Sequence, residues 1–234
     1  MVVFTKKPKN VTVIEGFPGI GLVGTISTGF LVDHLKCEKI GSHFFDDVAP
    51  QLAIHQNKLI DPVTIYYNKE YNLAIIHSIT APVTIEWKAA DMVLDVCKQL
   101  DAKEIITIEG VGSQTNSPKS FYYTQNSAVK AKFEKNKIPP IGEGIIIGVT
   151  AGLLQRNPNI PLTCVFAETV SKLPDSKAAA KIIETLDKYL NLKVDYKPLL
   201  KQAEAFEQKL RALVEHVQRT REIQEDKHQL DYLG

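Results

Sequence analysis

The sequence predicts an α/β domain with a mostly parallel central sheet that helices cover on both faces, followed by one long helix. Short apolar runs alternate with segments of helical spacing, which is typical of βαβ units and a parallel sheet. Between residues 51 and 78 the apolar runs are separated only by "NK" or "NKEYN", and connections this short indicate antiparallel hairpins. An apolar heptad pattern after residue 196 predicts the separate helix.

Each element follows from its local pattern. Strands are expected where short apolar runs end at a charged or glycine residue, and helices where apolar residues recur every three or four positions. In chain order we expect a strand at 11–15, a helix at 20–36, a strand at 39–45, the hairpins, a helix at 85–100, a strand at 104–108, a helix at 126–135, a strand-turn-helix over 144–154, a strand at 162–167 and a helix at 177–190.

The composition is that of a globular protein without a charged partner surface. Hydrophobic residues make up 44% of the chain, and the net charge of +1 gives no reason to expect a nucleic acid or an anionic membrane as partner. The apolar part of the opening segment is too short for a signal peptide, and no apolar run approaches the length of a membrane span. We therefore expect a soluble protein in the cytoplasm.

The cysteines and histidines are too scattered to predict a metal site. Cys37, Cys97 and Cys164 lie far apart in apolar surroundings and are expected as buried thiols, and neither C-x-x-C nor H-x-x-x-H occurs. No metal and no cofactor are therefore expected. His77, in "AIIHSITAP", has two interpretations: a proton shuttle, or the hydrogen-bonded core histidine that we favour.

The segment "VIEGFPGIGLVG", residues 13–24, contains G-x-G-x-x-G at Gly19, Gly21 and Gly24, between a predicted strand and a predicted helix. In a dinucleotide site these glycines would let a pyrophosphate approach the helix N-terminus, with Asp46 placed for the ribose. Alternatively, the glycines allow close packing of helix on strand, or the turn is the remnant of a small-molecule or phosphate site that has lost its chemistry. We favour packing, because the chain has hairpins where a dinucleotide domain needs a crossover helix.

Three carboxylates end predicted strands: Glu15, followed by Gly16; Glu109, followed by Gly110; and Glu168. The carboxyl ends of parallel strands line the crevice where ligands bind in open α/β sheets, so the three side chains are expected near one another. Such carboxylates could hold a ribose-like diol or a divalent ion, or act as general acid and base. The alternative, which we favour, is that each caps a neighbouring loop or helix. No G-x-S-x-G nucleophile motif accompanies them.

The segment from residue 197 reads as one long helix with an apolar seam. Apolar residues repeat in steps of four and three for about three heptads, which indicates a partner of the same kind or a groove on the body. We expect this seam to mediate oligomerisation. Its members are Leu199, Ala203, Phe206, Leu210, Leu213 and Val217.

Four motifs in order, "EGFPGIGLVG", "IEGVGSQ", "GIIIGVTAGLL" and "FAET", resemble the archaeal branch of the proteasome assembly chaperone 2 family over about residues 10–190. The resemblance implies a three-layer α/β/α fold around a mixed sheet, similar to that of phosphorylases and hydrolases. It also implies a non-enzymatic chaperone that binds proteasome α-subunits as an oligomer. The carboxylates at the strand ends would then be remnants of a phosphorylase-like crevice.

The resemblance also draws attention to the tail. Some members of the family dock a hydrophobic–Tyr–any ending into pockets between α-subunits, whereas this sequence ends Asp231, Tyr232, Leu233, Gly234. The tyrosine is thus one position early, which moves the terminal carboxylate by about 3.3 Å. Either the tail docks in a different geometry, or the chain assembles with itself and serves another partner.

These observations define three parts and three functional hypotheses. The parts are an α/β core over 1–195, a helix over 196–230 and a flexible tail over 231–234. The first hypothesis is a cytoplasmic chaperone that binds proteasome α-subunits as a homo-oligomer. The second is a small-molecule or nucleotide-binding enzyme that uses the carboxylates, and the third is a self-assembling scaffold that uses the heptads alone.

Overall fold

The structure is a computed structural model that describes residues 2–46, 48–50, 52–55, 57–80, 84–113, 118–169, 173–198 and 200. In chain order its strands are β1 (Val3–Phe4), β2 (Thr12–Gly16), β3 (Glu38–His43), β4 (Ala53–His55), β5 (Lys58–Ile60), β6 (Val63–Asn68), β7 (Leu73–Ser78), β8 (Glu104–Gly112), β9 (Ser120–Thr124) and β10 (Leu162–Thr169). Eight of them form one sheet of order β1-β3-β6-β7-β2-β8-β10-β9, and β4 pairs with β5 in a separate ribbon.

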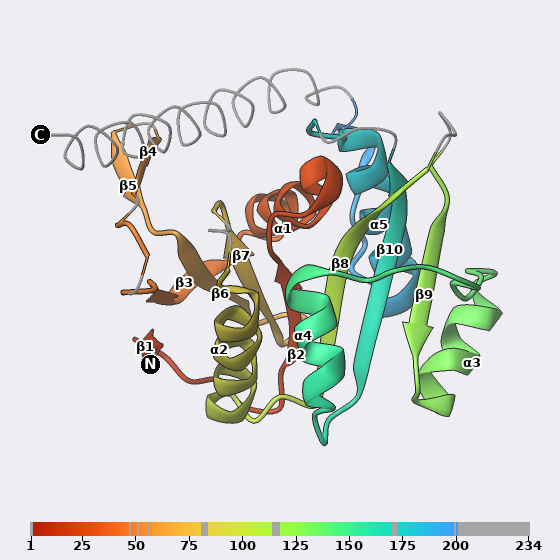
Figure 1. The fold of residues 1–234 in the computed structure, drawn as a ribbon, viewed down its shortest axis with the longest axis horizontal. Helices are drawn as coiled ribbons and strands as arrows, with labels where there is room; N and C mark the ends of the chain where they lie inside the picture. The colour runs from red at the N-terminus through yellow and green to blue at the C-terminus, as the bar shows by residue number, and fades with distance from the viewer. Residues whose placement is uncertain are drawn as a thin grey trace, which may run out of the picture.

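Helices cover both faces of this sheet, so the body has three layers (Figure 1). The helical segments are η1 (Ile20–Leu22), α1 (Val23–His34), α2 (Glu86–Gln99), α3 (Ser127–Lys135), α4 (Gly148–Arg156) and α5 (Ser176–Leu190). Helices α1 and α5 pack together on one face, α2 and α4 pack together on the other, and α3 lies beside the edge strand β9. The predicted α/β/α arrangement around a mixed sheet is confirmed.

The sheet is parallel at its centre and antiparallel toward both edges. Strands β7, β2, β8 and β10 are neighbours that run parallel, whereas β1, β3 and β6 on one side and β9 on the other pair antiparallel. The short connections in 51–78 form antiparallel pairs, as predicted: β4 with β5 and β6 with β7. Strand β3, which follows α1, lies away from β2 and pairs antiparallel with β6, whereas a dinucleotide-binding domain places the strand after its first helix parallel beside the first strand.

The alternation of side chains along the central strands decides which residues face which helices. Ile14 and Ile106 pack in the core beneath α1 and α5, while Val13 and Ile105 pack beneath α2 and α4. Because side chains alternate with a period of two, a residue two or four positions after Val13 or Ile105 faces the same α2–α4 side. Glu15 lies two positions after Val13, and Glu109 lies four positions after Ile105, so both predicted carboxylates face this side.

Three sequence expectations are corrected. The segment 144–147 is not a strand; the chain before it forms a single bridge, Pro140 to Tyr122, at the free edge of β9. Strand β9 comes instead from the "FYYT" segment, which the sequence did not predict as a strand. Strand β8 continues to Gly112, so Glu109 and Gly110 lie within it rather than after it.

The glycine turn is a packing device between η1, α1 and the central strands. A Cβ at Gly16 would lie 2.4 Å from the carbonyl oxygen of Gly24, and one at Gly110 would lie 2.1 Å from the carbonyl oxygen of Ile20. Gly21 has a φ of +66° and lies against the hydroxyl of Thr169, so it needs both the left-handed conformation and the missing side chain. These contacts support the packing interpretation of the turn.

Two predictions fall outside the described residues. The C-terminal seam (Leu199, Ala203, Phe206, Leu210, Leu213 and Val217) and the tail (Tyr232, Leu233 and Gly234) lie there, so both stay predictions. The described residues also bear on membrane insertion: none of their helices has the length and apolar character of a membrane span.

Replacing Gly110 by alanine is expected to destabilise the fold. The new Cβ would meet the Ile20 carbonyl, which is backbone and must move, and overpacking of this kind costs about 3 kcal/mol of unfolding free energy. Gly112→Ala is the matched control, because a Cβ there meets nothing within 4 Å. Chemical denaturation of both variants measures the difference, and equal stability of the two would contradict the packing role.

Candidate functional site

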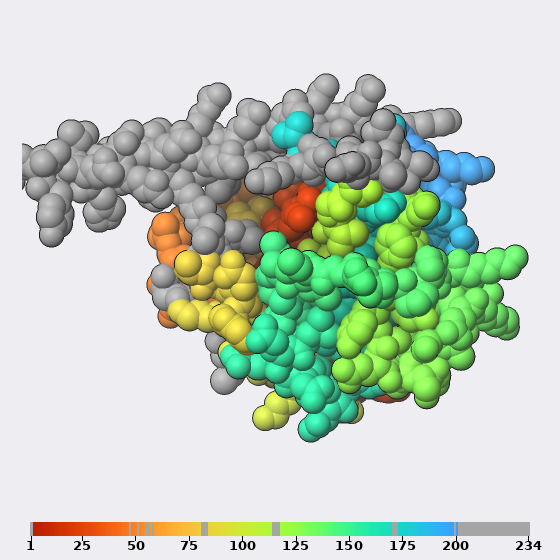
Figure 2. Space-filling view, turned by 45° about the vertical axis from the view of Figure 1, so that its right-hand side comes forward, coloured from red at the N-terminus to blue at the C-terminus, as the bar shows by residue number. Residues whose placement is uncertain are grey.

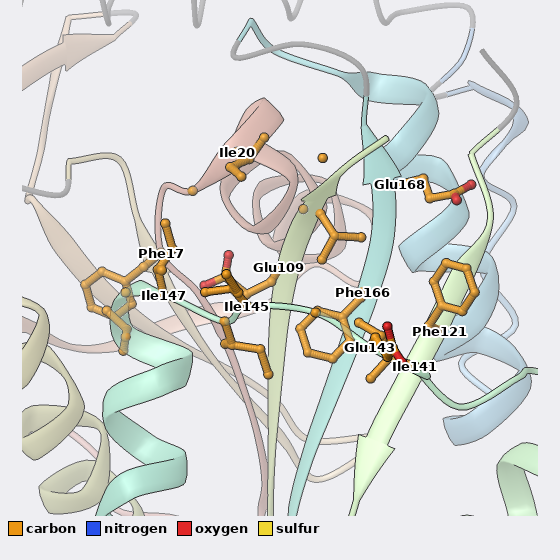
Figure 3. A pocket seen from close by; sticks show the side chains of 18 of the residues that line it. Phe17, Ile20, Glu109, Phe121, Ile141, Glu143, Ile145, Ile147, Phe166 and Glu168 are labelled. Atoms are coloured by element: carbon orange, nitrogen blue, oxygen red, sulfur yellow. The ribbon is translucent and has the colours of Figure 1, made fainter. Parts of the chain in front are cut away.

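A pocket of about 630 Å³ lies on the α2–α4 side of the sheet, at the carboxyl ends of β8 and β10 (Figure 3). Its walls are the glycine turn (Phe17–Ile20), the segment 109–112 of β8 and the loop 141–147 that leads into α4. In Figure 2 this loop and α4 lie between α2 and the β9–α3 segment. The pocket is therefore where the sequence placed the candidate crevice, although the loop was not expected to be part of it.

The floor of the pocket is a row of three side chains from neighbouring strands. Glu109 of β8 pairs in register with Phe166 of β10, which pairs with Phe121 of β9. Residues paired in register point to the same face of a sheet, so one carboxyl group and two aromatic rings lie side by side beneath the pocket (Figure 3). The floor is thus apolar with one acidic end.

Glu109 is linked to Glu15 through the hydroxyl group of Thr150. Thr150 lies in the first turn of α4 and is fully buried, and its Oγ1 is 3.1 Å from Glu109 Oε1 and 3.4 Å from Glu15 Oε1. Glu15 lies behind Glu109 and is 1% exposed, and its Oε2 accepts the backbone N–H of Phe17 at 3.2 Å. The structure therefore brings two of the three predicted carboxylates into one hydrogen-bonded group.

Burial changes the protonation of both carboxyl groups. Desolvation and then the charge of Glu109 raise the pKa of Glu15 to about 8, against the lowering effects of the Phe17 N–H and Thr150. Desolvation also raises the pKa of Glu109 to about 7, and its bond with Thr150 opposes this. At neutral pH Glu15 therefore carries a proton.

A protonated Glu15 completes the hydrogen bonding of Thr150. A threonine hydroxyl has one hydrogen and can donate to only one of the two carboxyl groups, and Glu109 is the nearer. The proton of Glu15 can then be donated to Thr150 Oγ1. The three side chains form a chain from Glu15 through Thr150 to Glu109, and Glu109 Oε2 is left facing the pocket, without a hydrogen-bond donor among the described residues.

The third predicted carboxylate, Glu168, lies at the other end of the pocket (Figure 3). Its Oε2 accepts the backbone N–H of Lys119 at 3.0 Å, so it holds the segment before β9 as the capping alternative proposed. Glu109 and Glu168 thus line one pocket, whereas Glu15 lies behind Glu109; the sequence predicted the three near one another but not the link through Thr150.

Of the predicted glycines, only Gly19 and Gly110 line the pocket. Gly19 lies against the Glu109 carboxyl group, since a Cβ there would lie 2.7 Å from Glu109 Oε2. The remaining ones, Gly16, Gly21 and Gly24, pack against backbone or Thr169 behind it. A phosphate at this turn would meet an acidic side chain instead of a basic one, which disfavours the nucleotide interpretation.

His77 belongs to the opposite face. Its Nδ1 is 2.9 Å from the hydroxyl of Thr28 in α1, and burial lowers the pKa of its ring to about 4, which keeps it neutral. It does not line the pocket, which agrees with a core histidine. The residue that the sequence analysis missed is Thr150; its signal was a hydroxyl in the first turn of a helix that follows a glycine-rich loop, "GEGIIIGVT".

The described lining of the pocket has carboxyl groups that can accept hydrogen bonds and exchange a proton. The described residues of its lining include no Ser, Thr, Cys, Lys, Arg or His side chain. In the part of the chain that the structure describes, no three His, Cys, Asp or Glu side chains are grouped so that they could hold a metal ion. A ligand in this pocket would meet the Glu109 carboxyl group at one end of an apolar floor.

Comparisons with known proteins find similarity along nearly the whole chain. The model of the PAC2 family matches residues 13–214. The uncharacterized protein MJ0106 of Methanocaldococcus jannaschii is 28% identical and covers 91% of this chain and 90% of its own. The crystal structure of Pyrococcus furiosus PbaA, an archaeal homolog of proteasome-assembly chaperone, is 27% identical, with a TM-score of 0.82 over 94% of this chain and 100% of that one.

A further solved structure shows the same fold. Pyrococcus furiosus PbaB, an archaeal proteasome activator, is 24% identical and has a TM-score of 0.75 over 91% of this chain and 98% of its own. At this identity the similarity establishes the architecture only.

Replacing Glu15 by glutamine is expected to change the pH dependence of stability. The folded protein keeps this proton up to about pH 8, whereas an unfolded chain releases it near 4.5, so the free energy of unfolding falls as pH rises between these values. The glutamine amide imitates the protonated acid and can donate to Thr150. The variant should therefore gain stability relative to the parent, by at most about 1.4 kcal/mol per pH unit in this range.

Denaturation curves at several pH values measure this gain. Glu168→Gln is the control, since that carboxylate lies apart from the Glu15–Thr150–Glu109 chain. A stability difference for Glu15→Gln that stays constant between pH 5 and pH 8 would contradict the raised pKa.

Proposed function

This chain belongs to the PAC2 family, and on that premise we propose that it is a proteasome-assembly chaperone of the cytoplasm, which binds proteasome α-subunits as a homo-oligomer. The observation that carries the proposal is the full-length similarity, in sequence and in fold, to an archaeal homolog of proteasome-assembly chaperone. Similarity of the whole body matters here because a chaperone of this kind works through its surface rather than through one reactive group.

The proposal includes the absence of an enzymatic activity. The pocket presents carboxyl groups and apolar walls, and among the described residues of its lining no side chain could serve as a nucleophile other than a carboxylate. This composition favours a chaperone over the phosphorylase-like or hydrolase-like enzyme that the carboxylates alone suggested.

An exposed apolar ribbon supports assembly. Ile54 of β4 and Leu59 of β5 are paired in register, so both side chains lie on one face of the ribbon, and they are 72% and 68% exposed. Leu52 beside them is also exposed. A two-stranded ribbon is marginally stable alone, and an exposed apolar cluster of this kind marks a protein contact. We propose that this ribbon contacts another subunit.

Removal of residues 231–234 is expected to abolish binding to α-subunits while the homo-oligomer persists. The reason is the anchoring role proposed for Tyr232, whose ring and nearby terminal carboxylate would be held together in one pocket of the partner. Native mass spectrometry of the chain alone, and then mixed with α-subunits from the same source, measures both species.

Tyr232→Ala in the full-length chain is the matched variant, because it keeps the length and the terminal carboxylate. A Glu109→Gln, Glu168→Gln double variant should bind α-subunits like the parent, because neither carboxylate belongs to the tail. If the shortened chain still took up α-subunits, the tail would not be the anchor; if the parent failed to bind them, the chaperone proposal itself would be wrong.

Charged residues in the ribbon should disperse the oligomer. In Ile54→Lys, Leu59→Lys two ammonium groups would lie on the exposed face of the ribbon and resist burial in the proposed contact, so the mass should shift to smaller species. Leu173→Lys, at a half-exposed leucine outside the ribbon, is the control. Phe206→Lys, Leu210→Lys tests the predicted seam in the same way, and an oligomer that survives both double variants would refute both contacts.

A further inference from the structure

The charged side chains that line the pocket are all acidic among the residues that the structure describes. They are Glu86, Glu109, Glu143 and Glu168, and every other described lining residue is apolar, glycine or proline. A cavity with carboxyl groups, apolar walls and no cationic side chain in this lining favours positively charged ligands and repels phosphates and carboxylates. The volume of about 630 Å³ is within the size range of small-molecule sites.

We propose that this pocket binds a protonated organic amine, whose ammonium group is held by Glu109 and whose apolar body lies on Phe166 and Phe121. This is a ligand site in the body of the protein, and it does not rest on the proposed chaperone function. The ligand class is set by the floor of the pocket, where the carboxyl group and the two rings lie in one row.

The position of Glu109 defines where the ammonium group binds. Its Oε1 accepts from Thr150, while its Oε2 faces the pocket beside the backbone of Gly19, where no described residue donates to it. Glu109 is half-buried, and an N–H donor of a cation can give this oxygen a charge-assisted hydrogen bond. A hydroxyl group could donate as well, but its bond lacks the cation's charge and is weaker.

The chain of Glu15, Thr150 and Glu109 sets the charge at that point. Because Glu15 keeps its proton up to about pH 8 and Glu109 ionises near pH 7, the pair presents one negative charge rather than two between these pH values. One charge matches one ammonium group. Cys97 and Cys164 near the pair do not alter this balance, because burial raises the pKa of both thiols to about 12 and they stay neutral.

The apolar part of the ligand has a matching surface. Besides the two rings, the lining includes Phe17 and five isoleucines: Ile20, Ile141, Ile145, Ile146 and Ile147. Ile145 and Ile147 are 90% and 64% exposed, and Figure 3 shows them near Glu109 and Phe17. Exposed isoleucines over a ring-lined floor would lose contact with water when an aliphatic or aromatic body lies between them.

The test uses three probes that share a phenylalkyl body: 2-phenylethylamine as the cation, 2-phenylethanol as the neutral analogue and 3-phenylpropanoate as the anion. Isoleucine methyl resonances of the full-length protein report binding and place it. We expect the amine to shift the methyl resonances of the five lining isoleucines but not those of core residues such as Ile14, and to bind about tenfold more tightly than the alcohol. The anion should produce no shifts.

Two variants that each remove one negative charge from the pocket distinguish binding at Glu109 from a general attraction of cations to an acidic cavity. Glu109→Gln should weaken binding of the amine about tenfold or more, whereas Glu168→Gln should change it by less than about threefold. Because Glu109→Gln removes a buried charge, we expect it to fold, and its methyl spectrum checks this.

The results with the three probes and two variants either support the amine site or overturn it. Binding of the amine at the lining isoleucines, with the alcohol weaker and the Glu109 variant impaired, supports the proposal. Equal loss in both variants would mean an acidic field without a site. Equal affinity for amine and alcohol, shifts elsewhere, or no binding of the amine would each overturn it, even if the chain binds α-subunits.

Discussion

The approach of backbone to backbone around the glycine turn is the constraint on which the rest of the structure depends. Gly16 lies against Gly24, and Gly110 lies against the carbonyl group of Ile20, at separations that leave no room for a Cβ. These contacts seat η1 and the start of α1 directly on β2 and β8. Because the turn packs closely on the sheet, Gly19 lies against the Glu109 carboxyl group and forms one wall of the pocket.

That packing has an electrostatic consequence. It buries Glu15 at the end of β2, and the period of the strands turns both Glu15 and Glu109 toward α4. Two carboxylates in such a place cannot both remain ionised without a large cost, and the threonine between them lets one proton serve both. The same architecture therefore explains why the pair carries one negative charge between about pH 7 and pH 8. It also explains why the acidic lining disfavours a phosphate at this site.

Much of the fold and part of the candidate site could be predicted from the sequence, for physical reasons that differ from element to element. The layers and hairpins were predictable because apolar periodicity and connection length are local properties, and the grouping of the carboxylates followed from the direction of parallel strands. Strand β9 and the loop 141–147 could not be predicted in this way. Several segments of the chain compete to pair with the edge of β10, and their local sequence does not decide which one does. Thr150 was missed because its role arises only when α4 packs against β2 and β8.

The central claim, a carboxyl pair that shares one proton inside the packed body, can be measured directly by titrating the side-chain carboxyl carbons of Glu15 and Glu109 with ¹³C NMR. Glu15 is expected to titrate at about pH 8 and Glu109 at about pH 7, and Thr150→Val should alter both. Titration of both groups near their ordinary value of 4.5 would contradict it.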